Sequence, residues 1–237
     1  MRVLFIEPPP TLEWLPGSSV STAGRRHPSL NFTGEQVYSY INLSAAAVLR
    51  RAGHEVAYWH CQTHDIPVAA MRERLTAARP GLVVIMAEHV NLDVTAAIIR
   101  LVHQESDAAV VLVGPLATAL DADIMERLGP DFVLRREWDL AVAQLAGTLD
   151  EKRPLAAVAG LAWRRDGAIV RNPDGALIEN LDDLPFPAFD LVDLRRFYES
   201  VFKRFPAATT ITSRGCPFHC VYCAFPETIY DHVHRAQ

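Results

Sequence analysis

Three cysteines near the end of the chain have the spacing Cys216-x-x-x-Cys220-x-x-Cys223. A loop this short can bring three thiolates to one side, where they can bind a single inorganic centre. Structural zinc sites and most iron–sulfur clusters take four protein ligands. Three thiolates would therefore leave a four-iron cluster with one iron open to an exogenous ligand. The spacing predicts a [4Fe-4S] cluster that takes part in chemistry.

A zinc site is the alternative interpretation of these cysteines, with His219, His232 or His234 as the fourth ligand. Zinc sites usually pair their ligands as C-x-x-C and take a second pair well downstream. The histidines after Cys223 lie at no spacing that is usual for a zinc finger, so the cluster is the stronger interpretation. Cys61 stands alone near an apolar stretch and is predicted to be a small buried side chain.

The cysteines lie within Ser213–Ala224, which resembles the cluster loop of radical S-adenosylmethionine (SAM) enzymes, including the aromatic Tyr222 before the third cysteine. Upstream, Leu181–Asp190 resembles the segment that enters this domain in the cobalamin-binding branch of the superfamily. The chain is therefore identified as similar to the N-terminal part of a cobalamin-binding-domain-containing radical SAM protein, truncated just after the cluster loop. The resemblance implies that the three cysteines hold the cluster and that Tyr222 supports the adenine side of SAM.

Residues 1–148 alternate short apolar runs with amphipathic stretches, which is the pattern of repeated βα units. Strands are expected at Arg2–Glu7, Glu55–His60, Leu82–Met86, Ala109–Val113 and Asp131–Leu134. Helices are expected at Ser39–Ala52, Val68–Arg79, Leu92–His103 and Ala119–Leu128. The strands are rich in Val, Ile and Leu without strict alternation, as strands buried on both faces are. The predicted fold class is α/β, with a doubly wound, Rossmann-like, parallel five-stranded sheet.

Ligands of such sheets bind in the crevice beyond the carboxyl ends of the strands. No G-x-G-x-x-G follows the first strand, which argues against a dinucleotide. The resemblance implies that cobalamin lies there instead, with its nucleotide tail between the sheet and the flanking helices. The strand-end residues expected to contact the cofactor are Pro9, Glu88, His89, Gly114, Pro115, Arg136 and Glu137.

The sequence departs from some cobalamin-binding relatives at these strand ends. The D-x-H-x-x-G motif, which supplies an axial histidine in methionine-synthase-like domains, has no match. A Gly-Pro-His turn of the relatives reads Gly114-Pro115-Leu116 here. The alternative interpretation is an α/β scaffold in which the charged strand-end residues are solvated. The long segment Thr11–Gln36 is placed to cover a bound ligand, and loops of this length are often functional.

The domains are predicted as residues 1–148 for the cobalamin-binding-like domain, 149–203 for a connector and 204–237 for the start of the radical SAM domain. Asp166-Gly167 predicts a type I′ hairpin turn within the connector. A short helix is expected at Asp193–Phe202, and a first barrel strand at Ala207–Thr212. A barrel of eight βα units takes ~250 residues. The chain is therefore expected to be a fragment, a truncated relative or one half of a split enzyme.

The composition narrows the remaining functions. The 237 residues carry a formal net charge of −5 without a basic block, so nucleic acid is not an expected partner. No apolar run approaches the ~20 residues that a membrane span needs, and the first residues are too short an apolar run for a secretory signal. Because a cluster with an open iron requires a reducing compartment, we expect a soluble, cytoplasmic protein.

The resemblance implies a cobalamin-dependent radical SAM methyltransferase that acts on an unactivated carbon. In that family the cluster reduces SAM, a 5′-deoxyadenosyl radical removes a hydrogen atom from the substrate, and methylcobalamin delivers the methyl group. The implied partners are a small-molecule substrate or a missing C-terminal barrel, and an electron donor such as flavodoxin or ferredoxin. Two further hypotheses are a non-catalytic corrinoid- or partner-binding module with a vestigial cluster stub, and a radical SAM enzyme whose front domain is empty.

Overall fold

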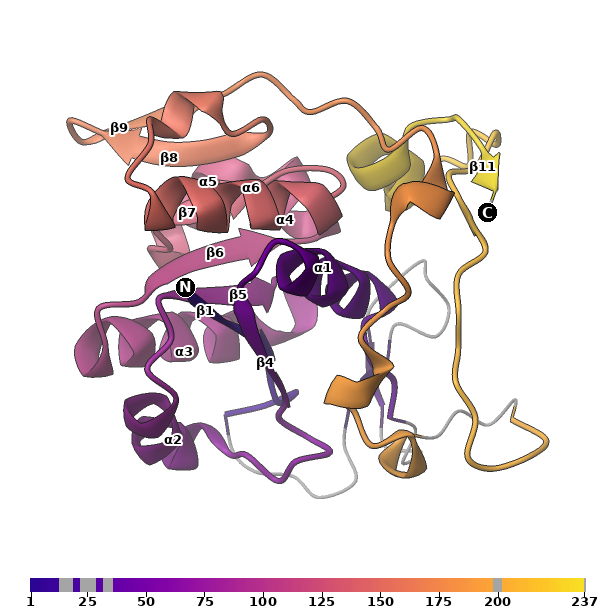
Figure 1. Ribbon diagram of the computed structural model, residues 1–237, viewed down its shortest axis with the longest axis horizontal. Helices are drawn as coiled ribbons and strands as arrows, with labels where there is room; N and C mark the ends of the chain where they lie inside the picture. Colours follow the sequence, from indigo (N-terminus) through magenta and orange to yellow (C-terminus); the bar gives the residue numbers. More distant parts are fainter. Residues whose placement is uncertain (13–18, 22–28, 32–35, 198–201, 237) are drawn as a thin grey trace.

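The computed structural model describes residues 1–12, 19–21, 29–31, 36–197 and 202–236. In Figure 1 the sheet and its helices occupy one side of the molecule. The residues after 171, called the C-terminal segment below (orange to yellow), run along the other side beyond α1. Most of the segment Thr11–Gln36, which was predicted to cover a ligand, lies outside the described residues. Its described residues include an antiparallel pair, β2 (Ser19–Ser21) with β3 (Ser29–Asn31).

Five parallel strands form the centre of the sheet, as predicted. They are β1 (Arg2–Glu7), β4 (Glu55–His60), β5 (Leu82–Met86), β6 (Ala109–Val113) and β7 (Phe132–Leu134). Their order across the sheet is β4-β1-β5-β6-β7. The first strand along the chain therefore pairs on one side with the second strand and on the other with the third. In a sheet of this order, the crevice between β1 and β5 is where ligands bind.

The sheet continues beyond the five predicted strands. Strands β8 (Leu161–Arg165) and β9 (Ala168–Arg171) add an antiparallel hairpin to the edge of β7, which makes seven strands. The turn residues Asp166 and Gly167 have φ angles of 53° and 80°, as the predicted type I′ turn requires. The predicted strand count was thus too low, because the hairpin covers the open edge of β7. The predicted domain boundaries stay predictions.

Helices cover both faces of the sheet, which confirms the doubly wound arrangement (Figure 1). One face carries α1 (Tyr40–Arg51) and α6 (Asp139–Asp150), and the other carries α2 (Met71–Ala78), α3 (Leu92–Glu105) and α5 (Asp121–Leu128). Side chains alternate between the two faces along each strand. In β1, Val3 and Phe5 pack towards α1, whereas Leu4 and Ile6 pack towards α3.

Short turns complete the connections on the sheet side. They are α4 (Pro115–Ala119), η1 (Val68–Ala70), η2 (His89–Asn91) and η3 (Leu155–Ala157). In the C-terminal segment lie η4 (Leu181–Asp183), η5 (Phe189–Leu191), η6 (Leu194–Arg196) and the π-helix η7 (Pro226–Tyr230). Both η2 and α4 begin shortly after strands, β5 and β6 respectively, and so border the carboxyl end of the sheet.

The C-terminal segment differs from the prediction at two places. Residues 207–212 form no strand; pairing begins with β10 (Ser213–Arg214) against β11 (Arg235–Ala236). A strand needs a neighbouring strand, and no described strand pairs with 207–212. The backbone of Thr209 instead exchanges hydrogen bonds with the Tyr38 hydroxyl, at 2.7 and 3.0 Å. Of the helix predicted at Asp193–Phe202, the described part holds only the single turn η6, and residues 198–201 lie outside the description.

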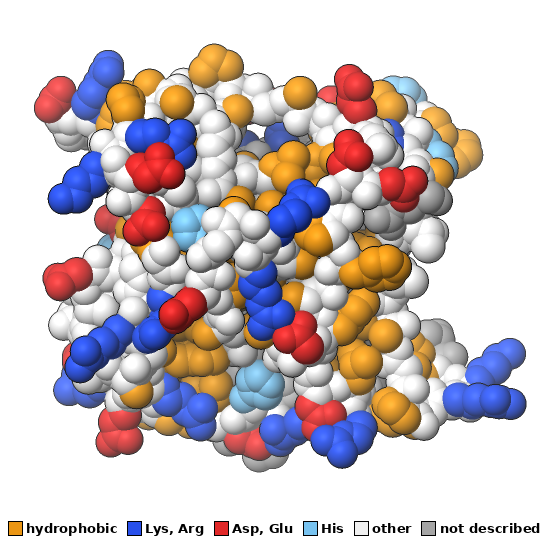
Figure 2. All heavy atoms as spheres, in the orientation of Figure 1, with side chains coloured by type: hydrophobic (Ala, Val, Ile, Leu, Met, Phe, Trp, Pro, Cys, Tyr) orange, Lys and Arg blue, Asp and Glu red, His pale blue; other side chains and the backbone are white. Residues whose placement is uncertain are grey.

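The surface carries charges of both signs. On the face drawn in Figure 2, basic and acidic side chains are interspersed around apolar ones. Within the described ranges, no helix combines the length and the apolar character that crossing a membrane requires.

Candidate cofactor site

A cavity of about 470 Å³ lies at the carboxyl end of the sheet, beside the crevice between β1 and β5. Its front wall consists of residues at or just after the carboxyl ends of the strands, among them Glu7, Met86 and Glu88, with Pro115 after β6. The opposite wall comes from the C-terminal segment and includes Arg214 together with two of the three cysteines. The cavity therefore joins the two parts of the chain that the sequence singled out.

Glu7 organises the front wall. Its carboxylate accepts hydrogen bonds from the Ser39 amide (2.8 Å), the Asn42 side chain (3.3 Å) and the Tyr58 hydroxyl, and His60 Nε2 lies 3.4 Å from it. Burial, and then the charge of Glu7, raises the pKa of Tyr58 well above its ordinary value, so Tyr58 stays a donor. Burial lowers the pKa of His60, which favours the neutral ring.

Glu88 presents a second carboxyl group on the same wall. Burial, and then the negative charge of Glu7, raises its pKa to about 8. The group is therefore mostly protonated at neutral pH and can donate an O–H hydrogen bond.

Two buried amide oxygens on this wall have no hydrogen-bond partner among the described residues. They are Gln62 Oε1 and Asn91 Oδ1, and both residues line the cavity. A buried acceptor left without a partner costs about 1–3 kcal/mol. A ligand with amide donors would recover this free energy. A corrinoid carries amide side chains around its rim, so these two oxygens and the Glu88 hydroxyl fit cobalamin in their donor and acceptor chemistry.

The cysteine loop forms part of the opposite wall. Cys216 and Cys223 are half-buried and line the cavity, while Cys220 is exposed, and all three thiols are free. The Cys223 amide donates to the Cys220 carbonyl at 3.0 Å, which closes the turn between them. Three free thiols on one short loop fit a [4Fe-4S] cluster with an open iron.

The structure gives no support to a mixed cysteine–histidine zinc site. Among the described residues, the group whose ligand atoms lie close enough for a single ion contains His219, Glu227 and His232 and no cysteine.

Gly215, next to the first cysteine, has a φ of +88°. A Cβ atom built at this position would overlap the carbonyl group of Val233 in the returning chain. Only glycine therefore lets the two chain segments approach here. This constraint could not be predicted from the sequence, because it depends on the contact of Gly215 with Val233 in a distant part of the chain.

Buried ion pairs attach the cysteine loop to the front domain, which is the part of the chain that forms the parallel sheet and its helices. Arg214 donates to Asp139 (2.8 and 2.9 Å) and to Glu137 (3.2 Å), and each of these three side chains is at most 3% exposed. Arg235 also donates to Glu137, at 2.8 Å, and Arg136 donates to Asp231 at 2.6 Å. The start of helix α6 thus holds both strands of the β10–β11 pair.

The structure places the predicted site residues in four different settings. Glu88, Pro115, Cys216 and Cys223 line the cavity, and Pro9 and Gly114 are buried at the same strand ends. His89 and Tyr222 are exposed and are not among the residues that line it. Arg136 and Glu137 bind side chains of the C-terminal segment. The cofactor-binding roles of all these residues stay predictions.

Several residues of the site were not predicted from the sequence: Glu7, Gln62, Asn91, Asp139 and Arg214. Glu7 ends strand β1 and Asn91 comes soon after strand β5. Their position at strand ends was the signal in the sequence that could have identified them. The roles of Asp139 and Arg214 depend on a contact across 75 residues of chain, which no local pattern reveals.

The sequence is similar to one protein family and to two curated proteins. Residues 40–146 match the family described as the B12 binding domain. The chain is 25% identical over 186 residues to "Uncharacterized methyltransferase PH0819" of Pyrococcus horikoshii, covering 78% of the chain and 40% of that protein. It is 27% identical over 229 residues to the anaerobic magnesium-protoporphyrin IX monomethyl ester cyclase of Synechocystis sp., covering 94% of the chain and 42% of that protein.

Solved structures share the fold over nearly the whole chain. The radical SAM methyltransferase TsrM of Kitasatospora setae, with cobalamin and a [4Fe-4S] cluster bound, has a TM-score of 0.68 at 16% identity, covering 100% of this chain and 43% of that one. The cobalamin-dependent SAM radical enzyme OxsB, with aqua-cobalamin and SAM bound, has a TM-score of 0.72 at 16% identity, covering 99% and 29%.

Residues 40–146 are thus similar to the B12 binding domain, and the chain, including the cysteine loop, shares its fold with part of each of these solved structures. The predicted resemblance to the N-terminal part of cobalamin-binding radical SAM proteins is thereby confirmed. The chain spans less than half the length of the curated relatives that it matches.

Proposed function

We propose that this chain is the N-terminal portion of a cobalamin-dependent radical SAM methyltransferase that acts on an unactivated carbon. One observation carries the proposal: a single cavity has the ligand-binding end of the sheet on one wall and Cys216 and Cys223 on the other. A corrinoid and a cluster bound there would face each other. The match of residues 40–146 to the B12 binding domain supports the first of these two cofactors.

The residues of the chain have separate roles in this proposal. Cys216, Cys220 and Cys223 hold the cluster. Glu88 donates to the corrinoid rim, and Gln62 and Asn91 accept from its amides. When bound, the cluster supplies an electron to SAM and the corrinoid supplies a methyl group. The protein itself fixes the distance between them, through the ion pairs of Arg214 with Asp139 and Glu137.

Reconstitution with iron and sulfide under anaerobic conditions tests the cluster. We expect broad sulfur-to-iron charge-transfer absorption, which should be lost in Cys220→Ala because two thiolates cannot hold the cluster in one place. Cys61→Ala is the matched control, since Cys61 is buried in the front domain, away from the loop, and should not affect the iron content. Tight binding of one zinc by the cysteines, without incorporation of sulfide, would contradict the proposal.

Titration with cobalamin tests the front domain. Because the sequence lacks D-x-H-x-x-G, we expect a bound corrinoid with its nucleotide base displaced and no histidine on cobalt, which the absorption spectrum distinguishes from the base-on form. His89 is exposed, so His89→Ala should leave this spectrum unchanged. Absence of binding at high protein concentration would favour the scaffold interpretation.

A second candidate outcome is ring closure instead of methyl transfer. It is favoured by the 27% identity to a protein named as a cyclase. The products of the full-length protein distinguish the two outcomes, because methyl transfer adds one carbon to the substrate and ring closure adds none.

A further inference from the structure

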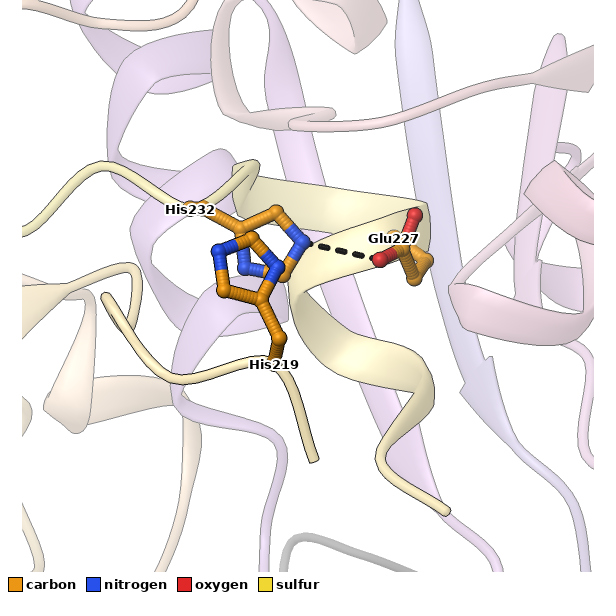
Figure 3. A group of neighbouring side chains, drawn as sticks. All are labelled: His219, Glu227 and His232. Atoms are coloured by element: carbon orange, nitrogen blue, oxygen red, sulfur yellow. Dashed lines mark hydrogen bonds and ion pairs between the residues drawn. The ribbon is translucent and has the colours of Figure 1, made fainter. Parts of the chain in front are cut away.

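Three potential metal ligands meet beside the cysteine loop, outside the cavity. His219 lies in the loop, Glu227 on the π-helix η7 and His232 in the turn that follows it, as Figure 3 shows. One ligand atom from each residue lies within 4.8 Å of the other two. Two imidazoles and one carboxylate are a donor set that zinc uses when it keeps a fourth position open.

The hydrogen bonds of His232 point to a cation. Its Nδ1 lies 3.2 Å from the Phe218 carbonyl oxygen, and its Nε2 lies 2.8 Å from Glu227 Oε1. Both neighbours are acceptors, whereas a neutral imidazole has only one N–H to donate. If Nδ1–H donates to Phe218, the Nε2 lone pair and the Glu227 carboxylate both face a position that suits a metal ion. A hydrogen bond from the second ring nitrogen to a backbone carbonyl is usual for metal-binding histidines.

His219 can supply the third ligand. Its ring stacks on that of His232, with the ring centroids 3.7 Å apart and the planes 27° from parallel. The side chain is exposed, so its ring can turn towards an ion without disturbing packed neighbours. We propose that His219, Glu227 and His232 form a divalent-cation site of the kind that takes Zn²⁺, separate from the three cysteines.

An ion at this site would link the cysteine loop to η7 and to the turn after it. His219 lies directly before Cys220, so the ion would restrict the loop on the side away from the cavity. Its fourth coordination position would face solvent and take water.

Zinc binding to the full chain tests the proposal under conditions in which the thiolates cannot compete. We would use the wild type with its cluster reconstituted, and the variant Cys216→Ser/Cys220→Ser/Cys223→Ser, both dialysed against Zn²⁺. We expect about one zinc per chain in each. With Co²⁺ as the probe, visible d–d bands should appear without the intense near-ultraviolet bands of thiolate coordination.

Matched variants locate the site. His232→Gln and Glu227→Gln should each weaken zinc binding by ~10-fold or more, since losing even a hydrogen bond to a metal ligand costs about 10–100-fold in affinity. His103→Gln is the control, because His103 also pairs with a carboxylate, Asp131 at 2.9 Å, but belongs to no three-ligand group among the described residues. The side chains of His219 and Glu227 are exposed and that of His232 is half-buried, so the variants should fold. Circular dichroism checks this.

Three outcomes would overturn the proposal. They are a wild type that retains no zinc, zinc that persists in His232→Gln, and zinc that disappears with the cysteines. Iron and sulfide contents, measured on the same samples, report on the cluster separately and keep its failure distinguishable.

Discussion

Glu88 is a buried carboxyl group beside the carboxylate of Glu7, and its pKa is about 8. The native protein therefore keeps this proton in a pH range where the unfolded chain has released it. Because the native state then binds more protons, the free energy of unfolding should fall as pH rises from about 4.5 to about 8. The contribution of this one group is at most about 1.4 kcal/mol per pH unit.

Glu88→Gln tests this linkage, since glutamine has a similar shape but does not titrate. We expect a flatter pH profile of the free energy of unfolding, and a variant more stable than the wild type above pH 8. Urea unfolding at several pH values measures both. Glu126→Gln, on the exposed side of α5, controls for the loss of one carboxylate. An unchanged slope in Glu88→Gln would show that Glu88 is ionised in the native protein.

Gly215 allows a second test at the level of single residues. In Gly215→Ala the new methyl group would overlap the Val233 carbonyl, so the cysteine loop should be displaced and the iron retained after reconstitution should fall several-fold. Gly53→Ala is the matched control, because Gly53 has the same φ of +88° but open space around it. Far-ultraviolet circular dichroism should stay native in both. Equal iron content in the two variants would contradict the importance of this close approach.

Residues identified by a local motif were predicted from the sequence, and residues that act through distant partners were not. The cysteine spacing and the strand ends pointed to Cys216, Cys223, Glu88 and Pro115 at the cavity. Glu7 receives its hydrogen bond from Tyr58 across 51 residues of chain. Its importance depends on the fold bringing the two strands together, which periodicity does not encode.

Among the structural elements, the contact of helix α6 with the β10–β11 pair is open to a direct test. Asp139→Asn should leave the buried Arg214 without full charge compensation. Removing one partner of a buried ion pair costs about 3–5 kcal/mol. We expect faster cleavage of the C-terminal segment by protease and a lower midpoint in urea.

Asp123→Asn is the control for this variant. Asp123 pairs with Arg127 on the exposed face of α5, and such pairs contribute about 0.3–0.5 kcal/mol. If Asp139→Asn behaved like Asp123→Asn, the buried ion pairs would not be what holds the loop on the front domain.

The parallel strands and their helices could be predicted because each is encoded locally, by an apolar run or by helical spacing. The hairpin β8–β9 was predicted as a hairpin, but its pairing with β7 was not, since pairing depends on a free edge elsewhere. Residues 207–212 have the composition of a strand and do not form one. Their composition gives only a propensity, and the lack of a neighbouring strand among the described residues decides the outcome.

For the whole molecule, we expect that the 237-residue chain cleaves SAM slowly and less than once per cluster. Its structural relatives are more than twice as long, and productive geometry needs the cofactor held from several sides. Orientation can supply ~7–11 kcal/mol of a barrier, and losing part of it slows turnover by orders of magnitude. Incubation of reconstituted protein with SAM and a strong reductant, followed by quantification of 5′-deoxyadenosine per cluster, measures this. Sustained multiple turnover would contradict the expectation.

The shared cavity has a consequence for how the two cofactors are acquired. If each wall binds a different cofactor, as proposed, part of the binding free energy of one would depend on the presence of the other. Thermodynamic linkage requires the effect to be mutual: if a filled cluster site tightens corrinoid binding by some factor, the corrinoid retains the cluster more tightly by the same factor. Couplings of this kind typically amount to 5–150-fold. At limiting supply, the chain would then exist mainly as empty and doubly loaded molecules, with the singly loaded forms in the minority.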